Sequence, residues 1–178
     1  MDYTETPIHR ICGYEGLITA TTLDRVILPN GEHSLREVVE HPGGVTVLPI
    51  DDEGYVYCVR QFRYPMGEHM LELPAGKLEK GEDPLDCAKR ELSEETGITA
   101  MQYTDLGKLY PSPGFCRETL YLYLAQNLIF GQAHPDENEF LDVKKVHIDE
   151  LYKSVMNNEL ADAKTVVAIL KTKALLQN

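Results

Sequence analysis

The sequence predicts an α/β protein in which a mixed β-sheet carries helices on its faces. Three observations lead to this prediction. Short segments rich in β-branched and aromatic residues recur along the chain, one strongly marked helix stands in the middle of them, and two further helices follow at the end. The length of 178 residues, with 43% hydrophobic and 26% charged residues, fits one globular domain of ordinary size with a small appendage.

Residues 1–42 are expected to form an N-terminal β-hairpin segment ahead of a main domain at 43–178. The stretch 16–28 is rich in β-branched residues, as strands are. Pro29-Asn30-Gly31 then has the residue types of a turn, and residues 34–40 are predicted to form the return strand.

The main domain is predicted to contain five strands and three helices. The strands are expected at residues 45–49, 56–61, 70–73, 120–125 and 143–148. The helices are expected at residues 84–96, 150–157 and 163–176. Asp83, Asp149 and Asp162 are the predicted N-caps, and Gly97 is placed just past the end of the first helix.

Composition excludes several classes of function. A formal net charge of −12 argues against a nucleic-acid polymer as partner, because a phosphate backbone attracts Lys and Arg. No apolar run approaches the roughly 18 residues that a membrane span needs, and the polar, acidic start does not resemble a secretory signal, so a cytoplasmic location is expected. The four cysteines form no CxxC pair and are interpreted as free thiols rather than a zinc or redox site.

The middle helix carries an unusual set of carboxylates. Glu91, Glu94 and Glu95 are three or four residues apart or adjacent, so they share one helix face. Like charges at this spacing destabilise a helix, and they stand near its C-terminus, where the macrodipole is also unfavourable. A hard cation such as Mg²⁺ would remove the penalty. The alternative is a solvated acidic face with Arg90 and Glu94 as an ordinary ion pair.

The segment around this helix resembles the Nudix box, G-x5-E-x7-R-E-U-x-E-E-x-G-U, in which U is aliphatic. Every fixed position matches: Gly76, Glu82, Arg90, Glu91, Leu92, Glu94, Glu95, Gly97 and Ile98. The resemblance implies a Nudix hydrolase with an α/β/α sandwich fold, whose mixed sheet carries the box as a loop–helix–loop. It also implies cleavage of a nucleoside diphosphate that is linked to another moiety.

The resemblance further implies a site for Mg²⁺ or Mn²⁺. Its ligands would be the carboxylates of Glu91 and Glu95 and the backbone carbonyl of Ala75. Glu94 would either join them or act as a base. Arg90 would orient the carboxylates through charge-assisted hydrogen bonds. The metal would neutralise the diphosphate and activate a water molecule.

Beyond the box, the chain is most similar to the ADP-ribose pyrophosphatase branch, which also includes nucleoside diphosphate sugar hydrolases. Arg63 and Glu72 match residues that lie at the substrate in this branch, and an arginine suits a diphosphate because it donates two parallel hydrogen bonds. Pro113, Gly114 and Phe115 match a loop that borders the ribose. The alternatives are a surface ion pair for Arg63 and a plain turn for the loop.

The resemblance assigns two further roles to the acidic loop at residues 136–140. Glu137 would be the catalytic base and Glu139 a further metal ligand, whereas the alternative is an ordinary exposed acidic loop. In this branch the N-terminal segment exchanges across a two-fold axis, so a homodimer is expected. Arg36, Tyr3 or Tyr14 would reach the neighbouring pocket, without a sequence signal to choose among them, and monomeric packing is the alternative.

The function implied by the resemblance is metal-dependent hydrolysis of ADP-ribose to AMP and ribose 5-phosphate, with water deprotonated by Glu137. Three alternatives remain: a GDP-mannose or ADP-glucose hydrolase, a hydrolase of many sugar nucleotides, and a non-catalytic ADP-ribose sensor, against which the complete box argues. The stretch Ala161-Asp162-Ala163-Lys164-Thr165 also resembles the branch and is interpreted as the start of a helix.

Overall fold

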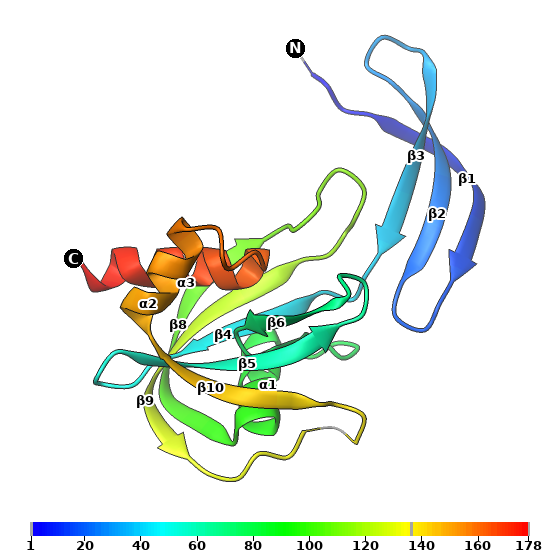
Figure 1. The fold of residues 1–178 in the computed structure, drawn as a ribbon. Helices are drawn as coiled ribbons and strands as arrows, with labels where there is room; N and C mark the ends of the chain where they lie inside the picture. The colour runs from blue at the N-terminus through cyan, green and yellow to red at the C-terminus, as the bar shows by residue number, and fades with distance from the viewer. Residues whose placement is uncertain (1, 136, 178) are drawn as a thin grey trace. The chain divides into compact units, whose positions relative to one another are not determined.

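The structure is a computed structural model that describes residues 2–135 and 137–177. The chain divides into two compact units (Figure 1). The first comprises Met1–Gly43 and Tyr110–Thr119, and the second comprises Gly44–Leu109 and Leu120–Asn178. Met1, Asn178 and Asp136 of the predicted acidic loop lie outside the described residues.

The first unit is an antiparallel sheet in the order β1-β2-β3, with bounds β1 (Thr6–Glu15), β2 (Ala20–Ile27) and β3 (His33–Glu40). The predicted hairpin corresponds to β2 and β3. The prediction lacked β1, whose ten residues are all exposed and therefore show no half-buried alternation. The loop at 110–119 is bound to β3, because the Val39 N–H donates to the Phe115 carbonyl at 2.8 Å.

The second unit contains two sheets, ordered β7-β4-β9-β8 and β10-β5-β6. Their bounds are β4 (Gly44–Pro49), β5 (Tyr55–Arg63), β6 (Glu68–Glu72), β7 (Ala75–Lys77), β8 (Ile98–Leu109), β9 (Leu120–Phe130) and β10 (Leu141–His147). Strand β4 pairs with β9 in parallel and with β7 antiparallel, so the larger sheet is mixed, as predicted. Strands β7 and β8 were not predicted.

Helices cover both sides of these strands, α1 (Pro84–Thr96) on one and α2 (Ile148–Met156) with α3 (Ala163–Leu176) on the other (Figure 1). The residues of β4 alternate between two cores. Val45 and Val47 pack with Leu92 of α1, whereas Leu48 packs with Ile169 of α3. This alternation is the period of a strand buried on both faces. The predicted α/β sandwich with helices on both faces is confirmed.

The helix limits follow from their caps. Helix α1 begins after Asp83 and ends at Gly97, and α3 begins after Asp162, as predicted. The prediction for α2 was wrong: its N-cap is His147, whose ring accepts a hydrogen bond from the backbone N–H of Asp149. A capping histidine was missed because Asp is much the commoner cap residue.

Within residues 2–135 and 137–177, no helix combines the length and the apolar character that crossing a bilayer requires.

Candidate active site

Helix α1 is fixed at both ends by residues of the box. The side chain of Asp83 accepts hydrogen bonds from the backbone N–H groups of Leu85, at 2.9 Å, and Asp86, at 3.3 Å. At the other end Gly97 has φ +71°, and a Cβ there would lie 2.6 Å from the backbone N of Ala133. Glycine is needed at position 97 for both reasons, the left-handed backbone and the close approach of the chain.

The glycine that opens the box makes room for a carboxylate. A Cβ on Gly76 would lie 1.9 Å from the carboxylate of Glu91, so any other residue at this position would displace that side chain. Strand β7, which contains Gly76, is paired with β4. The backbone of β7 is therefore held directly against the acidic face of α1.

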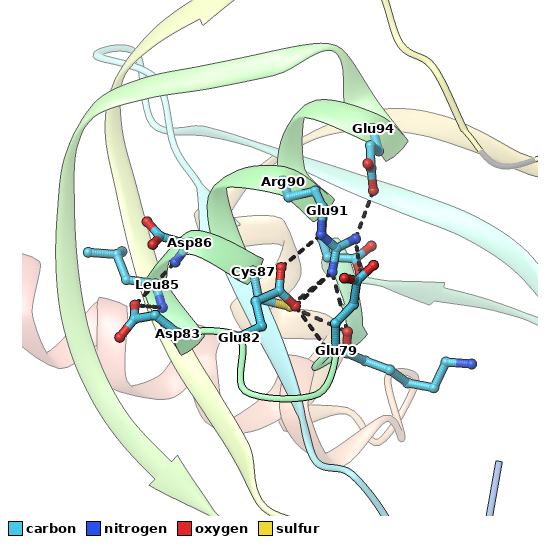
Figure 2. Close-up of polar contacts among 10 residues, drawn as sticks. Glu79, Glu82, Asp83, Leu85, Asp86, Cys87, Arg90, Glu91 and Glu94 are labelled. Atoms are coloured by element: carbon cyan, nitrogen blue, oxygen red, sulfur yellow. Dashed lines mark hydrogen bonds and ion pairs between the residues drawn. The ribbon is translucent and has the colours of Figure 1, made fainter.

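Arg90 connects three carboxylates through one guanidinium group (Figure 2). Its Nε donates to Glu82 at 2.9 Å, and its Nη1 donates to Glu91 at 2.8 Å and to Glu94 at 2.9 Å. The hydrogen bond from Arg90 lowers the pKa of Glu82 to about 2. Arg90 therefore sets the positions of the box carboxylates, while its single positive charge leaves most of their negative charge unbalanced.

Two carboxylates of the predicted metal site are buried. Glu91 is 9% exposed and Glu95 is 1% exposed. The backbone N–H of Ala75 donates to Glu95 at 3.1 Å, which brings these two predicted ligand residues together. Burial raises the pKa of Glu95 to about 8 and also raises the pKa of Glu91. Ionised carboxylates in this position need a compensating cation.

The acidic loop is attached to the end of α1. The backbone N–H of Gly131 donates to the carbonyl of Gly97, and that of His134 donates to the carbonyl of Glu94, both at 2.8 Å. On its far side the loop runs into β10, where Leu141 pairs with Gln61 of β5. Both ends of the loop are thus held within the second unit.

The two predicted functional residues of this loop differ in burial. Glu137 is exposed, and Glu139 is partly buried. The charge of Glu139 contributes to the raised pKa values of both Glu91 and Glu95, so its carboxylate lies within electrostatic range of the buried pair. The structure therefore brings residues from β7, α1 and the loop to one place.

The donor set at this place suits a hard divalent cation. Within the described part of the chain, no three His, Cys, Asp or Glu side chains are already closed around a metal-sized space. In this structure Arg90 engages two of the carboxylates, Glu91 and Glu94. However, oxygen donors with excess negative charge and raised pKa values are what Mg²⁺ or Mn²⁺ would bind and stabilise. The residues present fit such a metal.

A second charged cluster contains the predicted substrate residues. Arg63 donates through Nε and Nη2 to both oxygens of Glu72 at 2.7 Å. Lys164 also donates to Glu72, and to Asp162 at 2.9 Å. Burial alone would raise the pKa of Glu72, but its bonds to Arg63 and Lys164 outweigh burial and lower it. Sequence reasoning missed Lys164, because its stretch was interpreted only as a helix start.

The remaining predicted substrate residues lie in the first unit. An open hollow of about 420 Å³ is lined by Leu23, Leu35, Arg36, Glu37, Gly114 and Phe115. It unites three predicted residues, Arg36, Gly114 and Phe115, whereas Pro113 is not among the lining residues. Arg36 is held by Glu5, which accepts from its Nε at 2.9 Å. Tyr3 and Tyr14 are each 73% exposed.

The sandwich fold and the carboxylate-bearing helix define a Nudix protein, and the chain belongs to that family: a NUDIX domain matches residues 40–167. Membership in this family and the relatives below identify it as a pyrophosphohydrolase.

Curated relatives cover most of the chain. An ADP-ribose pyrophosphatase of Bacillus subtilis (strain 168) is 44% identical over 168 residues, which is 92% of this chain and 91% of the relative. A methanol dehydrogenase activator of Bacillus methanolicus is 42% identical over 158 residues, 88% of this chain and 85% of the relative. A solved structure of an ADP compounds hydrolase matches with a TM-score of 0.85 over 97% of this chain and 94% of that chain; at 21% identity it shows the fold alone.

Proposed function

We propose that this chain hydrolyses ADP-ribose to AMP and ribose 5-phosphate with the aid of Mg²⁺ or Mn²⁺. The observation that carries the proposal is the pair of buried box carboxylates, Glu91 and Glu95, beside an acidic loop that is bound to the same helix. The relative from Bacillus subtilis, with its name and high identity, supports ADP-ribose as the substrate.

In this proposal the metal is held by Glu91, Glu95, Glu139 and the carbonyl of Ala75, with Glu94 as a further ligand or base. The metal would neutralise the diphosphate and lower the pKa of a water molecule. The buried carboxylates are supported by charge: each has a raised pKa that a cation would lower again.

The protein side of the reaction is a proton transfer. Glu137, which is exposed on the loop, takes a proton from water as the water oxygen attacks one phosphorus in line. The bond between that phosphorus and the bridging oxygen breaks, and the bridging oxygen leaves with the other phosphate. The products are AMP and ribose 5-phosphate.

Arg63 would bind the diphosphate. Its Nε and Nη2 are used by Glu72, whereas Nη1 makes no hydrogen bond within the described residues, and the side chain is 38% exposed. An arginine held in this way keeps the two N–H groups of Nη1 for a phosphate oxygen at little entropic cost. Arg36, Gly114, Phe115 and Pro113 stay predicted substrate residues of the first unit, where the first three line one hollow.

A panel of sugar nucleotides tests the substrate. ADP-ribose, GDP-mannose and ADP-glucose would be incubated with the protein and Mg²⁺, and the products separated by anion-exchange chromatography. ADP-ribose should be cleaved fastest, with AMP and ribose 5-phosphate in equal amounts. If only GDP-mannose or ADP-glucose were cleaved, that sugar nucleotide would replace ADP-ribose as the proposed substrate. Binding of ADP-ribose without any turnover would favour the non-catalytic sensor.

We further propose a homodimer formed through the first unit. Support comes from large apolar side chains that are exposed in β1 and the turn after it: Ile8, Ile11, Tyr14, Leu17 and Ile18. Light scattering after gel filtration should give twice the chain mass, and an Ile11→Glu variant should give the monomer mass.

We also propose that the protein acts in the cytoplasm, a reducing compartment that suits its four free cysteines.

A further inference from the structure

Lys164, near the start of α3, is a cation in an unusually enclosed position. Its side chain is 11% exposed, and its ammonium group donates to Glu72 and Asp162, which are 2% and 16% exposed. A lysine at a helix start normally points into water, because burying its charge is costly unless it is paired. The enclosure therefore indicates a specific task for this charge.

We propose that Lys164 is a positioning residue for the reaction: it holds Glu72 so that Glu72 in turn presents Arg63 to the substrate diphosphate. The inference rests on the proposed function for its substrate. Within the described residues no hydrogen bond joins Lys164 to Arg63, so its effect would pass through the Glu72 carboxylate that both side chains share.

The first argument is geometric. The two carboxylate oxygens of Glu72 each accept from Arg63 at 2.7 Å, and Lys164 adds a second donor to one of them, Oε2. Three donors on one carboxylate leave it a single orientation. The plane of Glu72 then fixes the plane of the Arg63 guanidinium, which is only partly covered by the rest of the protein.

The second argument is that Lys164 itself is anchored. Asp162 accepts from Lys164 at 2.9 Å and also from the Thr165 hydroxyl at 2.6 Å. The same hydroxyl oxygen accepts from the backbone N–H of Leu73 at 2.9 Å. Leu73 directly follows Glu72, and both Thr165 and Leu73 are fully buried. The start of α3 and the end of β6 are thereby locked together.

The third argument is the balance of charge. Arg63 and Lys164 supply two positive charges, and Glu72 and Asp162 supply two negative ones. Without Lys164 the cluster would carry an excess negative charge next to Arg63. An excess negative charge would repel an incoming diphosphate and leave Arg63 occupied in neutralising its neighbours.

The obvious competing explanation is that Lys164 only stabilises the fold. Lys173 is a matched control for that possibility, because it lies on the same helix and also pairs with a carboxylate, donating to Asp149 at 2.6 Å. Its side chain is 19% exposed, and its partner belongs to α2 rather than to the Arg63 cluster. Loss of Lys173 therefore removes an ion pair from the same helix, although one whose carboxylate is 54% exposed, without touching Glu72.

The experiment compares Lys164→Met, Lys164→Arg and Lys173→Met with the wild-type protein. Steady-state kinetics with ADP-ribose and Mg²⁺ should show KM raised about 10-fold by Lys164→Met, as expected for a lost charged hydrogen bond, with a smaller change in kcat. Lys164→Arg should recover most of the loss, and Lys173→Met should match wild type. If Lys164→Met does not fold, Lys164→Gln, which keeps a donor without the charge, replaces it.

Two further measurements separate this inference from the proposed function. In a Glu72→Gln background, Lys164→Met should have no additional effect on KM, since the link is already broken; an undiminished effect would overturn the inference. Binding of methylenediphosphonate, a bisphosphonate analogue of diphosphate that cannot be hydrolysed, is measured by calorimetry with Mg²⁺. Affinity should fall about 10-fold in Lys164→Met. Equal affinity overturns the inference, whereas absent turnover of sugar nucleotides by wild type overturns only the proposed function.

Discussion

Two clusters in the second unit are each organised around an arginine, and they differ in their charge balance. Arg90 meets three carboxylates, those of Glu82, Glu91 and Glu94, with one positive charge. Arg63 is accompanied by a lysine, so its cluster of two cations and two carboxylates is neutral. The pKa of the buried Glu72 is lowered, whereas burial raises the pKa of Glu91 in the Arg90 cluster and that of the neighbouring Glu95.

The contrast shows that the effect of burying a carboxylate depends on how many cations lie beside it. A buried carboxylate with two cations beside it, such as Glu72, has its charge fully balanced, so it can position other groups without binding a metal. Buried carboxylates without sufficient cations, such as Glu91 and Glu95, are stable only when they are protonated or when a metal is bound. The first kind suits the binding of an anionic substrate through Arg63, and the second suits the binding of a metal.

The largest effect is expected from removing the charge of Glu95, one of the two buried carboxylates of the predicted metal site. Glu95→Gln keeps the shape of the side chain and its acceptor for the Ala75 N–H, but removes a metal ligand. We expect kcat to fall at least about 100-fold, more than the loss of an outer-shell partner costs a metal enzyme. Rates at saturating Mg²⁺, with circular dichroism as the check on folding, measure this. Unchanged turnover in a folded variant would remove Glu95 from the metal site.

Arg90→Lys should have the next largest effect. A lysine cannot reach Glu82, Glu91 and Glu94 at once, because it lacks the planar fork that Arg90 uses for all three. We expect kcat to fall about 10- to 100-fold, the usual cost of losing a partner that orients metal ligands. Titration with Mg²⁺ should show weaker binding as well. A variant with lowered kcat but wild-type Mg²⁺ affinity would argue against the orienting role.

Arg63→Lys should separate binding from chemistry. Lysine retains the charge but loses the two parallel bonds to Glu72, so the group that meets the diphosphate is no longer fixed. We expect KM for ADP-ribose to rise about 10-fold, as for a lost charged hydrogen bond, with Mg²⁺ affinity unchanged. Paired measurements of KM and metal affinity test this, and a fall in metal affinity would show that the two clusters are not separate.

A further effect is expected on the stability of the metal-free protein. Because the pKa of Glu95 is raised from 4.5 to about 8, the folded state retains a proton that the unfolded chain releases between these pH values. Stability should therefore fall as pH rises through this window. Glu95→Gln should be the more stable protein at pH 8, by about 2 kcal/mol after allowance for relaxation of the site. Urea unfolding at pH 5 and pH 8 with chelator measures the difference; a wild type equally stable at both would contradict it.

Much of the fold and box could be predicted because their signals are local in sequence. The limits of α1 follow from Asp83 and Gly97, and the box spacing follows from contacts along one helix face. Gly76 is required by the close approach of Glu91, fifteen positions along the chain. Such requirements act over a short stretch, so single residues carry them.

The features that were missed depend on distant partners or on exposure. Lys164 and Glu72 are 92 positions apart in the sequence, and the residues around them carry no pattern that predicts the pair. Strand β1 is exposed throughout, and β8 is interrupted by an irregularity between Asp105 and Gly107, so neither shows a regular alternation. The assignment of His147 as a cap required the structure, since histidine rarely caps helices.

The most direct test of the central claim is a metal titration of chelator-treated protein. Calorimetry would follow Mg²⁺ binding while ADP-ribose cleavage is assayed at each metal concentration. Binding and turnover should rise together in wild type, both should be lost in Glu95→Gln, and binding should be unchanged in Lys164→Met. Turnover that persists in excess chelator, or equal Mg²⁺ binding by wild type and Glu95→Gln, would contradict the assignment of the buried carboxylates Glu91 and Glu95 as the metal site.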